Sequence, residues 1–139
     1  MSADVLPAIA YGTLRAGCHN ARLWDGLADH AAGWLHGFRL YKVAGAGFPI
    51  VQPSGDLDDR VRVDVLLWRS TEAAETGLER LDWLEGVPHL YRRERASVSL
   101  LGADYEVPGW VYLPNDGRLT RNAWSIKSGD WLDRGLETL

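Results

Sequence analysis

The alternation of apolar and polar residues predicts several strands along the chain. The clearest is 61–68, where three valines at every second position alternate with the charged Arg62 and Asp64. This period of two is typical of a half-buried strand. Segment 45–53 is predicted to be a loop that could supply one short buried piece. The other predicted strands, bounded by glycines, prolines or polar residues, are 5–11, 33–43, 91–101 and 105–113.

Two segments have the period of a helix instead. The stronger is 71–85, which Ser70 or Thr71 can cap and Gly86 can end. A shorter helix is predicted within 19–30, where apolar residues recur at helical spacing. Five or six strands with one strong and one weak helix predict an α+β domain built on a curved or closed sheet.

Length and composition limit the class of protein. A chain of 139 residues with 46% apolar residues and a net charge of −4 is expected to fold as one domain over 1–139. A single cysteine excludes an intrachain disulfide framework. The apolar runs are far shorter than the roughly 18–20 residues of a membrane helix, and no basic segment precedes a signal-like core. With a pI near 5.5, the chain is expected to be cytoplasmic, without a membrane or nucleic-acid partner.

The helix predicted over 71–85 carries a carboxylate on its apolar side. At 100° per residue, Glu85 falls between Leu78 and Leu81 in the projection down the axis. A buried carboxylate must be paired, hydrogen-bonded or shifted in pKa toward neutrality, and a shifted one can act as a general base near neutral pH. The alternative is that the last turn frays and Glu85 faces water; the pattern alone favours neither.

The segment Tyr11–Leu14 leaves a buried strand through Gly12. A glycine at such a point lets successive backbone N–H groups converge on an anion such as a carboxylate or a phosphate. The alternative, an ordinary turn from strand to loop, is the commoner meaning of so short a glycine motif. Neither a P-loop nor a dinucleotide-binding pattern follows it.

Cys18 and the histidines are weaker candidates for chemistry. Cys18 next to His19 suggests a thiol nucleophile, but adjacent residues seldom face each other, so a plain loop or core cysteine is favoured. The four histidines lack the spacing of metal ligands. The sequence therefore predicts no metal site.

Four short motifs follow one another along the chain. They are Y-G-T-L-R at 11–15, L-D-x-x-E-G at 81–86 followed by Y-x-R at 91–93, W-V-Y at 110–112, and S-G-D-W at 128–131. In this order and spacing they resemble signatures of the gamma-glutamylcyclotransferase-like family, over nearly the whole chain. The first motif continues with Gly17 and Asn20, and this longer form is most similar to the gamma-glutamylamine cyclotransferase branch.

The resemblance implies a small mixed β-barrel flanked by helices, and a cyclotransferase that needs no metal or cofactor. In the implied reaction, the α-amine of a γ-glutamyl group attacks its own γ-carbonyl, which gives 5-oxoproline and releases the attached amine or amino acid. Glu85 would be the general base that takes a proton from the α-ammonium. The backbone of the turn would bind the substrate's α-carboxylate, and a tyrosine would line the pocket; the implied substrate-binding residues are Tyr11, Gly12, Thr13, Leu14 and Tyr91. The expected partner is a small γ-glutamyl compound, and the expected assembly is a monomer or a homodimer.

One segment departs from the family's pattern. The strand before the helix has Val63-Asp64-Val65-Leu66, where the family often has a Gly-Glu-[VL]-[YW]-like run. The bulkier Val63, together with Leu66, could narrow the barrel or close the substrate side. A non-catalytic protein that keeps the pocket to hold an acidic metabolite is therefore the alternative function. Glu85 favours the enzyme, because a binder of anions gains nothing from a second buried negative charge.

Overall fold

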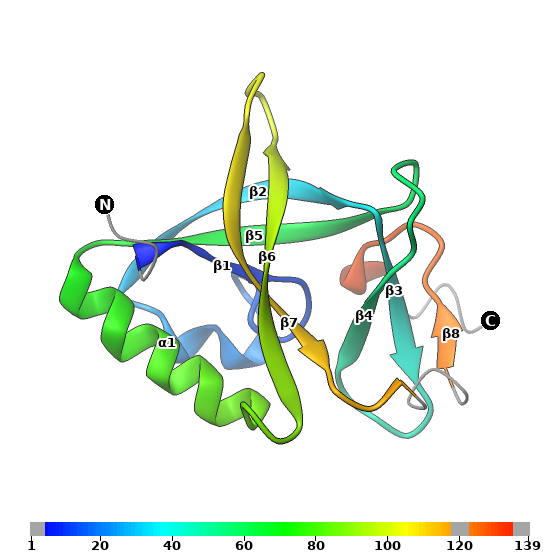
Figure 1. Ribbon diagram of the computed structural model, residues 1–139, viewed down its shortest axis with the longest axis horizontal. Helices are drawn as coiled ribbons and strands as arrows, with labels where there is room; N and C mark the ends of the chain where they lie inside the picture. Colours follow the sequence, from blue (N-terminus) through cyan, green and yellow to red (C-terminus); the bar gives the residue numbers. More distant parts are fainter. Residues whose placement is uncertain (1–4, 118–122, 135–139) are drawn as a thin grey trace.

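The computed structural model describes residues 5–117 and 123–134. Five strands form a closed barrel: β1 (Ala8–Ala10), β2 (Ala28–His36), β5 (Arg60–Trp68), β6 (Tyr91–Leu100) and β7 (Glu106–Pro114). Their order around the barrel is β1-β5-β2-β6-β7 (Figure 1). Because β1 pairs antiparallel with β5 but parallel with β7, the barrel is mixed. This confirms the predicted fold class.

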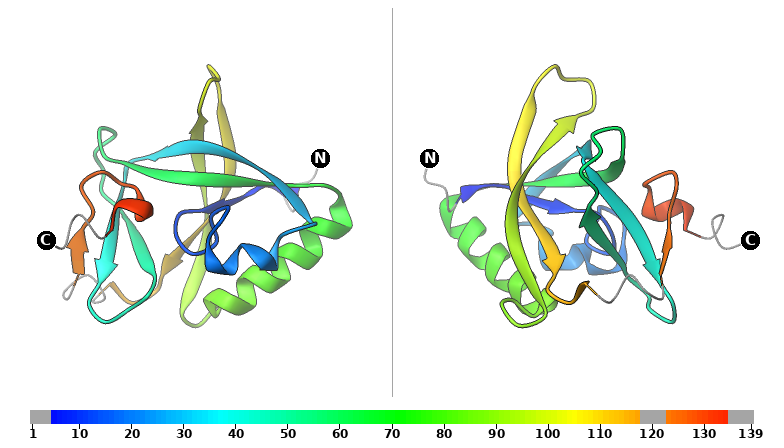
Figure 2. Two further views of the ribbon diagram at one scale, coloured as in Figure 1. Left: turned by 180° about the vertical axis from the view of Figure 1, so that it is seen from behind. Right: turned by 45° about the vertical axis from the view of Figure 1, so that its right-hand side comes forward.

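A second sheet and one long helix flank the barrel. The sheet consists of β3 (Phe38–Val43), β4 (Pro49–Pro53) and β8 (Ala123–Ser125), in the order β4-β3-β8. The helix is α1 (Thr71–Glu85), and η2 (His19–Leu23) and η4 (Trp131–Asp133) are short 3₁₀ helices. Figures 1 and 2 show α1 and the three-stranded sheet at opposite ends of the barrel.

Strand β5 connects the two parts of the hydrophobic core. Its three alternating valines fill the barrel together with Ile9 and Val111. The opposite face of β5 is also covered, because Leu66 packs in a second cluster with Leu78 and Leu81 of α1. The prediction of a half-buried strand is therefore wrong for the middle of β5, which α1 covers from outside.

Local signals define both ends of α1, as the sequence predicts. The Ser70 hydroxyl accepts a hydrogen bond from the N–H of Ala73 at 3.0 Å. At the other end Gly86 adopts the left-handed conformation, with φ of 69°, and its N–H donates to the carbonyls of Asp82 and Trp83. None of the helices within 5–117 and 123–134 has the length and apolar character needed to cross a membrane.

The strand predicted over 33–43 is two strands in two different sheets. Gly37 separates β2 from β3 with a φ of 85°, which favours glycine. The alternation of apolar residues continues on both sides of Gly37, so the pattern does not reveal the break.

Two other predictions are also corrected. The helix predicted within 19–30 is a 3₁₀ helix of five residues, because Ala28 and the residues after it pair with the end of β5. The loop predicted over 45–53 contains β4, which pairs with β3 along its whole length. In both cases pairing with another strand outweighs the local pattern.

Candidate active site

A cavity of about 280 Å³ lies where the end of β1, the end of α1 and the segments before β4 and β6 meet. The structure brings all six residues expected from the sequence into its wall: Tyr11, Gly12, Thr13, Leu14, Glu85 and Tyr91. The other lining residues are Ile9, Ala10, Asn20, Phe48, Pro49, Leu84, Leu90 and Tyr112.

The turn that follows β1 presents backbone donors in the cavity wall. The turn is closed by the Arg15 N–H, which donates to the Gly12 carbonyl at 3.0 Å. Asn20 braces it twice, donating from its backbone N–H to the Thr13 carbonyl at 2.8 Å and from its side-chain amide to the Thr13 hydroxyl at 2.9 Å. The N–H groups of Gly12, Thr13 and Leu14 donate to no acceptor in the described part of the chain. Three successive residues of the turn thus keep free donors.

Gly12 is needed because β4 approaches closely. A Cβ atom at this position would lie 2.5 Å from Cγ and 2.6 Å from Cδ of Pro49, which real contacts do not allow. Gly12 does not have a positive φ. The glycine therefore answers a steric demand from Pro49 and not a demand of the backbone angle.

Glu85 is the last residue of α1 and is half-buried in the cavity wall. Its carboxylate has neither a hydrogen bond nor an ion pair with any residue of 5–117 or 123–134. Burial raises its pKa from 4.5 to about 7. The helix does not fray before Glu85, since the left-handed Gly86 ends it one residue later. A carboxyl of this kind exchanges a proton readily near neutral pH.

Two of the three tyrosine hydroxyls around the cavity already donate hydrogen bonds within the protein. The Tyr11 hydroxyl donates to the Tyr112 carbonyl at 2.8 Å, and the Tyr112 hydroxyl donates to Oδ1 of Asp82 at 2.8 Å. The same Asp82 oxygen lies 3.0 Å from Nε of Arg93. Asp82 and Arg93, both part of the recognised motifs, therefore tie α1 to β6 and β7 and do not line the cavity.

Tyr91 differs from the other two tyrosines. Its side chain is largely buried, yet its hydroxyl has no partner among the described residues. Burial, and then the charge of Glu85, raise the pKa of Tyr91, so the hydroxyl keeps its proton and can donate it in a hydrogen bond.

Four apolar residues of the cavity wall were not predicted from the sequence. Phe48 and Pro49 come from a segment predicted to be a loop. Leu84 directly precedes Glu85 in the last turn of α1, and Leu90 directly precedes Tyr91 at the start of β6. Tyr112, another residue of the wall, belongs to the aromatic motif at 110–112. No comparable motif in the sequence marked these four apolar residues.

Val63 and Leu66, which depart from the family's pattern, are both fully buried in core clusters. Neither belongs to the lining of the cavity. Cys18 and His19 lie outside it as well and line a different surface depression. Within the described residues, no three of His, Cys, Asp or Glu come together as a metal site would require.

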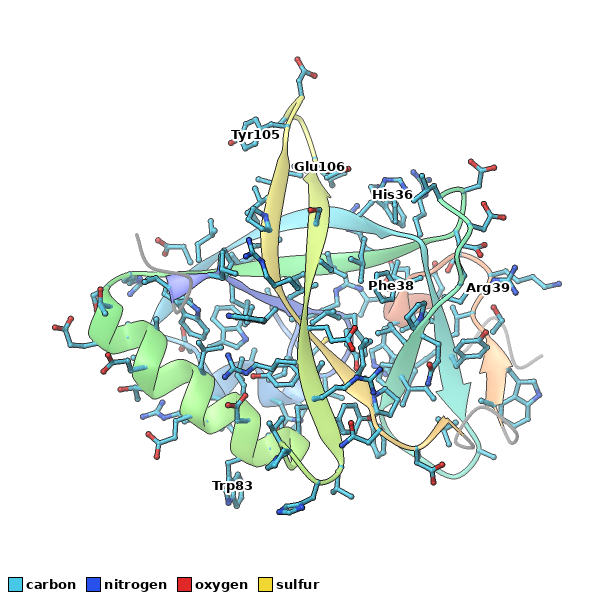
Figure 3. The ribbon with its side chains drawn as sticks, in the orientation of Figure 1. His36, Phe38, Arg39, Trp83, Tyr105 and Glu106 are labelled. Atoms are coloured by element: carbon cyan, nitrogen blue, oxygen red, sulfur yellow. The ribbon has the colours of Figure 1, made fainter. Side chains whose placement is uncertain are left out.

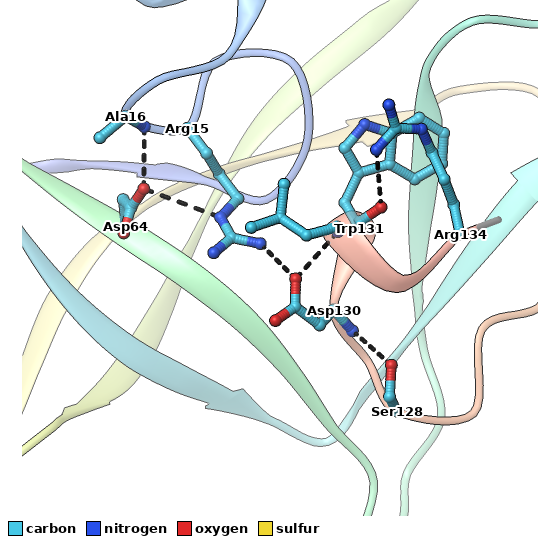
Figure 4. A network of polar contacts seen from close by, with 8 residues as sticks. Arg15, Ala16, Asp64, Ser128, Asp130, Trp131 and Arg134 are labelled. Carbon is cyan, nitrogen blue, oxygen red and sulfur yellow. Dashed lines mark hydrogen bonds and ion pairs between the residues drawn. The ribbon is translucent and has the colours of Figure 1, made fainter. Parts of the chain in front are cut away.

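Arg15 belongs to the first motif but turns away from the cavity into a network of polar contacts (Figure 4). Its Nη1 donates to Oδ1 of Asp130 at 2.7 Å, and its Nε lies 3.7 Å from Oδ2 of Asp64. The same Asp64 oxygen accepts the N–H of Ala16 at 2.9 Å. Arg15 therefore joins the turn after β1 to β5 and to the segment that precedes η4.

Solved structures similar to this one share its fold. An uncharacterised protein from Pyrococcus horikoshii has a TM-score of 0.68 at 22% identity, with 96% of this chain and 95% of that chain covered. A protein from Arabidopsis thaliana has a TM-score of 0.67 at 24% identity, covering 96% and 76%. An AIG2-like protein from Mus musculus has a TM-score of 0.62 at 21% identity, covering 82% of each chain.

Among curated proteins, none matches the chain in sequence. The family model of gamma-glutamyl cyclotransferase, AIG2-like proteins matches residues 8–133. That span contains every barrel strand, α1 and the whole described wall of the cavity. The chain belongs to the gamma-glutamyl cyclotransferase, AIG2-like family.

Proposed function

We propose that the protein converts a γ-glutamyl amine or γ-glutamyl amino acid into 5-oxoproline and the free amine. The observation that carries this proposal is the unpaired carboxyl of Glu85, whose pKa of about 7 suits a general base, in one cavity with a turn of free backbone donors. Membership of the family supports a cyclotransferase in general. The substrate and the roles of individual residues are part of the proposal.

The turn after β1 is proposed to bind the substrate's α-carboxylate. The free N–H groups of Gly12, Thr13 and Leu14 can donate to it, as backbone nests do to anions elsewhere. This explains how an anion can be held without a cationic side chain. Tyr91 would line the pocket and use its free hydroxyl to donate to the substrate.

Glu85 is proposed to move the protons of the reaction. It takes one proton from the α-ammonium, and the freed amine attacks the γ-carbonyl carbon. A new C–N bond closes the ring, and the bond from that carbon to the leaving nitrogen breaks. The leaving nitrogen receives the proton held by Glu85 and the second proton that the attacking nitrogen sheds, so it departs as an ammonium ion. All atoms come from the substrate, and the main requirement is that the α-amine and the γ-carbonyl are held close together.

A panel of γ-glutamyl amines and γ-glutamyl amino acids, assayed for 5-oxoproline, tests the proposal. We expect catalytic turnover of at least one member, unchanged in the presence of EDTA because the reaction needs no metal. Tight binding of the panel without any 5-oxoproline would instead support the alternative, a protein that only holds an acidic metabolite. Loss of turnover with EDTA, restored by a divalent ion, would overturn the cofactor-free mechanism.

A further inference from the structure

We propose that the leaving amine carries an apolar substituent without a charged group, and that leaving groups with a carboxylate are selected against. The inference rests on the proposed function, because it concerns the part of the substrate that the reaction releases. Two independent features of the cavity support it: the apolar character of its two exposed wall residues, and the distribution of charges around it.

The two exposed residues of the cavity wall are both apolar. Phe48 and Leu90 line the cavity while 47% and 67% exposed, respectively, and the half-buried Leu84 lines it as well. They come from three separate segments: the loop before β4, the last turn of α1 and the loop before β6. Apolar side chains that converge on one opening gain free energy when an apolar group covers them.

Leu90 is held in place by its backbone. Its N–H donates to the Gly86 carbonyl at 2.8 Å, and its carbonyl accepts the N–H of Asn115 at 2.9 Å. A Cβ on Gly86 would lie 2.9 Å from Cδ1 of Leu90, so the leucine side chain packs directly over the glycine. Leu90 is therefore held at the opening by its backbone and by its contact with Gly86.

The charges around the cavity disfavour an acidic leaving group. Glu85 is the one charged side chain in the described lining, which includes no Arg, Lys or His. Three arginines of the described chain that adjoin lining residues in the sequence are already paired: Arg15 with Asp130, Arg92 with Glu94, and Arg93 with Asp82. The free N–H groups of the turn are assigned to the α-carboxylate. A second carboxylate would meet no cationic side chain in the described lining and would be repelled by the first one and by Glu85.

Three substrates that differ in one group test the inference. They are γ-glutamyl-3-methylbutylamide, γ-glutamyl-leucinamide and γ-glutamyl-leucine, whose leaving amines carry no added group, a neutral carboxamide and a carboxylate on the same carbon skeleton. We expect kcat/KM for the methylbutylamide to exceed that for γ-glutamyl-leucine by at least about tenfold. The leucinamide should fall closer to the methylbutylamide, because its added group is polar but uncharged.

The outcomes separate this inference from the proposed function. Turnover of γ-glutamyl-leucine equal to or faster than that of the methylbutylamide would overturn the inference and leave the cyclotransferase intact. If no compound yields 5-oxoproline, the cyclotransferase proposal fails, and calorimetric binding of the same three compounds then decides the preference. Equal or tighter binding of γ-glutamyl-leucine would overturn the inference in that case too.

A charge introduced at the opening provides a second test. Leu90→Lys should raise kcat/KM for γ-glutamyl-leucine. The ratio of kcat/KM for the methylbutylamide to that for γ-glutamyl-leucine should therefore fall at least about fivefold. Leu90→Gln removes the apolar surface without adding a charge. It should lower kcat/KM for the methylbutylamide and should not raise kcat/KM for γ-glutamyl-leucine. Leu57→Lys adds the same charge at an exposed site outside the cavity and should leave the ratio unchanged. An unchanged ratio in Leu90→Lys would contradict the proposal.

Discussion

Two carboxylates close to the first motif have opposite surroundings. Glu85 shares the cavity with the turn at 11–14 and has no partner in the described chain, so burial raises its pKa to about 7. Asp130 contacts the next residue of the motif, Arg15. Burial alone would raise the pKa of Asp130, but hydrogen bonds from Arg15 and from the N–H of Leu132, with the nearby positive charges, lower it.

The difference shows how one short motif serves two purposes. Its first four residues line the cavity and offer backbone donors, and Arg15 points the other way and fastens the turn to the rest of the chain. A paired charge such as Asp130 fixes shape, whereas an unpaired one such as Glu85 keeps its reactivity. Substitutions at Glu85 and at Arg15 test this contrast, because the first should lower turnover and the second should lower stability.

The largest effect is expected from Glu85→Gln. If Glu85 is the base, turnover should fall by about 10²–10⁴-fold, because the amide keeps the shape and cannot accept the proton. Steady-state kinetics measure this, with thermal unfolding to verify the fold. Glu79→Gln, on an exposed position of the same helix, is the matched control and should retain full turnover. Wild-type turnover in Glu85→Gln would remove Glu85 from the mechanism.

Arg15→Met should lower stability more than turnover per folded molecule. The substitution leaves the buried Asp64 without its cation, and breaking a buried ion pair in this way costs about 3–5 kcal/mol. Arg39→Met is the control, because Arg39 and Asp59 form an exposed pair at 2.8 Å whose loss should cost far less. Figure 3 shows Arg39 on β3, away from α1. Equal unfolding midpoints in urea for the two variants would show that the Arg15 network is not structural.

Gly12→Val should affect both substrate binding and stability. It disturbs the turn at 11–14, which lies between the cavity and the Arg15 network. The added Cβ meets Pro49, and overpacking of this kind costs about 1–3 kcal/mol. We also expect KM to rise at least about tenfold, since the N–H groups of the turn are displaced. Gly47→Val is the control for stability, because a Cβ there has no neighbour within 4 Å. A variant at position 12 with wild-type KM would separate Gly12 from substrate binding.

Features with local physical causes were predicted from the sequence. The ends of α1 follow from the Ser70 cap and the left-handed Gly86. Helical geometry put Glu85 on the apolar side of α1 if the last turn did not fray, and the left-handed Gly86 shows that it does not. The same geometry directs Trp83 to solvent, where it is 81% exposed (Figure 3). The turn at 11–14 was recognised through its motif.

Features that depend on distant pairing could not be predicted. Arg15 is an edge residue of an anion-binding motif in the sequence, but its partner Asp130 is 115 positions away. The demand for glycine at position 12 comes from Pro49, which lies in a segment without a clear strand pattern. The sequence pattern does not reveal the break at Gly37, because apolar and polar residues alternate in both β2 and β3. The two strands differ only in the sheet that each one joins.

Smaller effects are expected when pH is varied. The pKa of Glu85 is higher in the folded protein, so its contribution to stability is favourable in acid and is lost as pH rises through about 7. Glu85→Gln should therefore be more stable than wild type at pH 8 but not at pH 4. The pKa of Asp130 is lowered, so its contribution is present above its ordinary pKa and is lost as pH falls.

Asp130→Asn should accordingly cost more stability at pH 7 than at pH 3, the reverse of the dependence at Glu85. Urea unfolding at the four pH values measures both. In wild type, kcat/KM should also decline below pH 7 as Glu85 becomes protonated. The same direction of pH dependence for both variants would contradict the contrast between the two carboxylates.

The smallest effect is expected from Cys18→Ser. Cys18 precedes η2 without a side-chain hydrogen bond to cap it, and it lies outside the cavity wall. A serine occupies nearly the same volume there, so stability should change by less than about 0.5 kcal/mol. Turnover should remain within twofold, and pretreatment of the wild type with iodoacetamide should leave most of its activity. If Cys18→Ser abolished turnover while Glu85→Gln did not, the nucleophile would be a thiol. The unpaired carboxylate would then lose its place in the mechanism, because its raised pKa would reflect burial and nothing more.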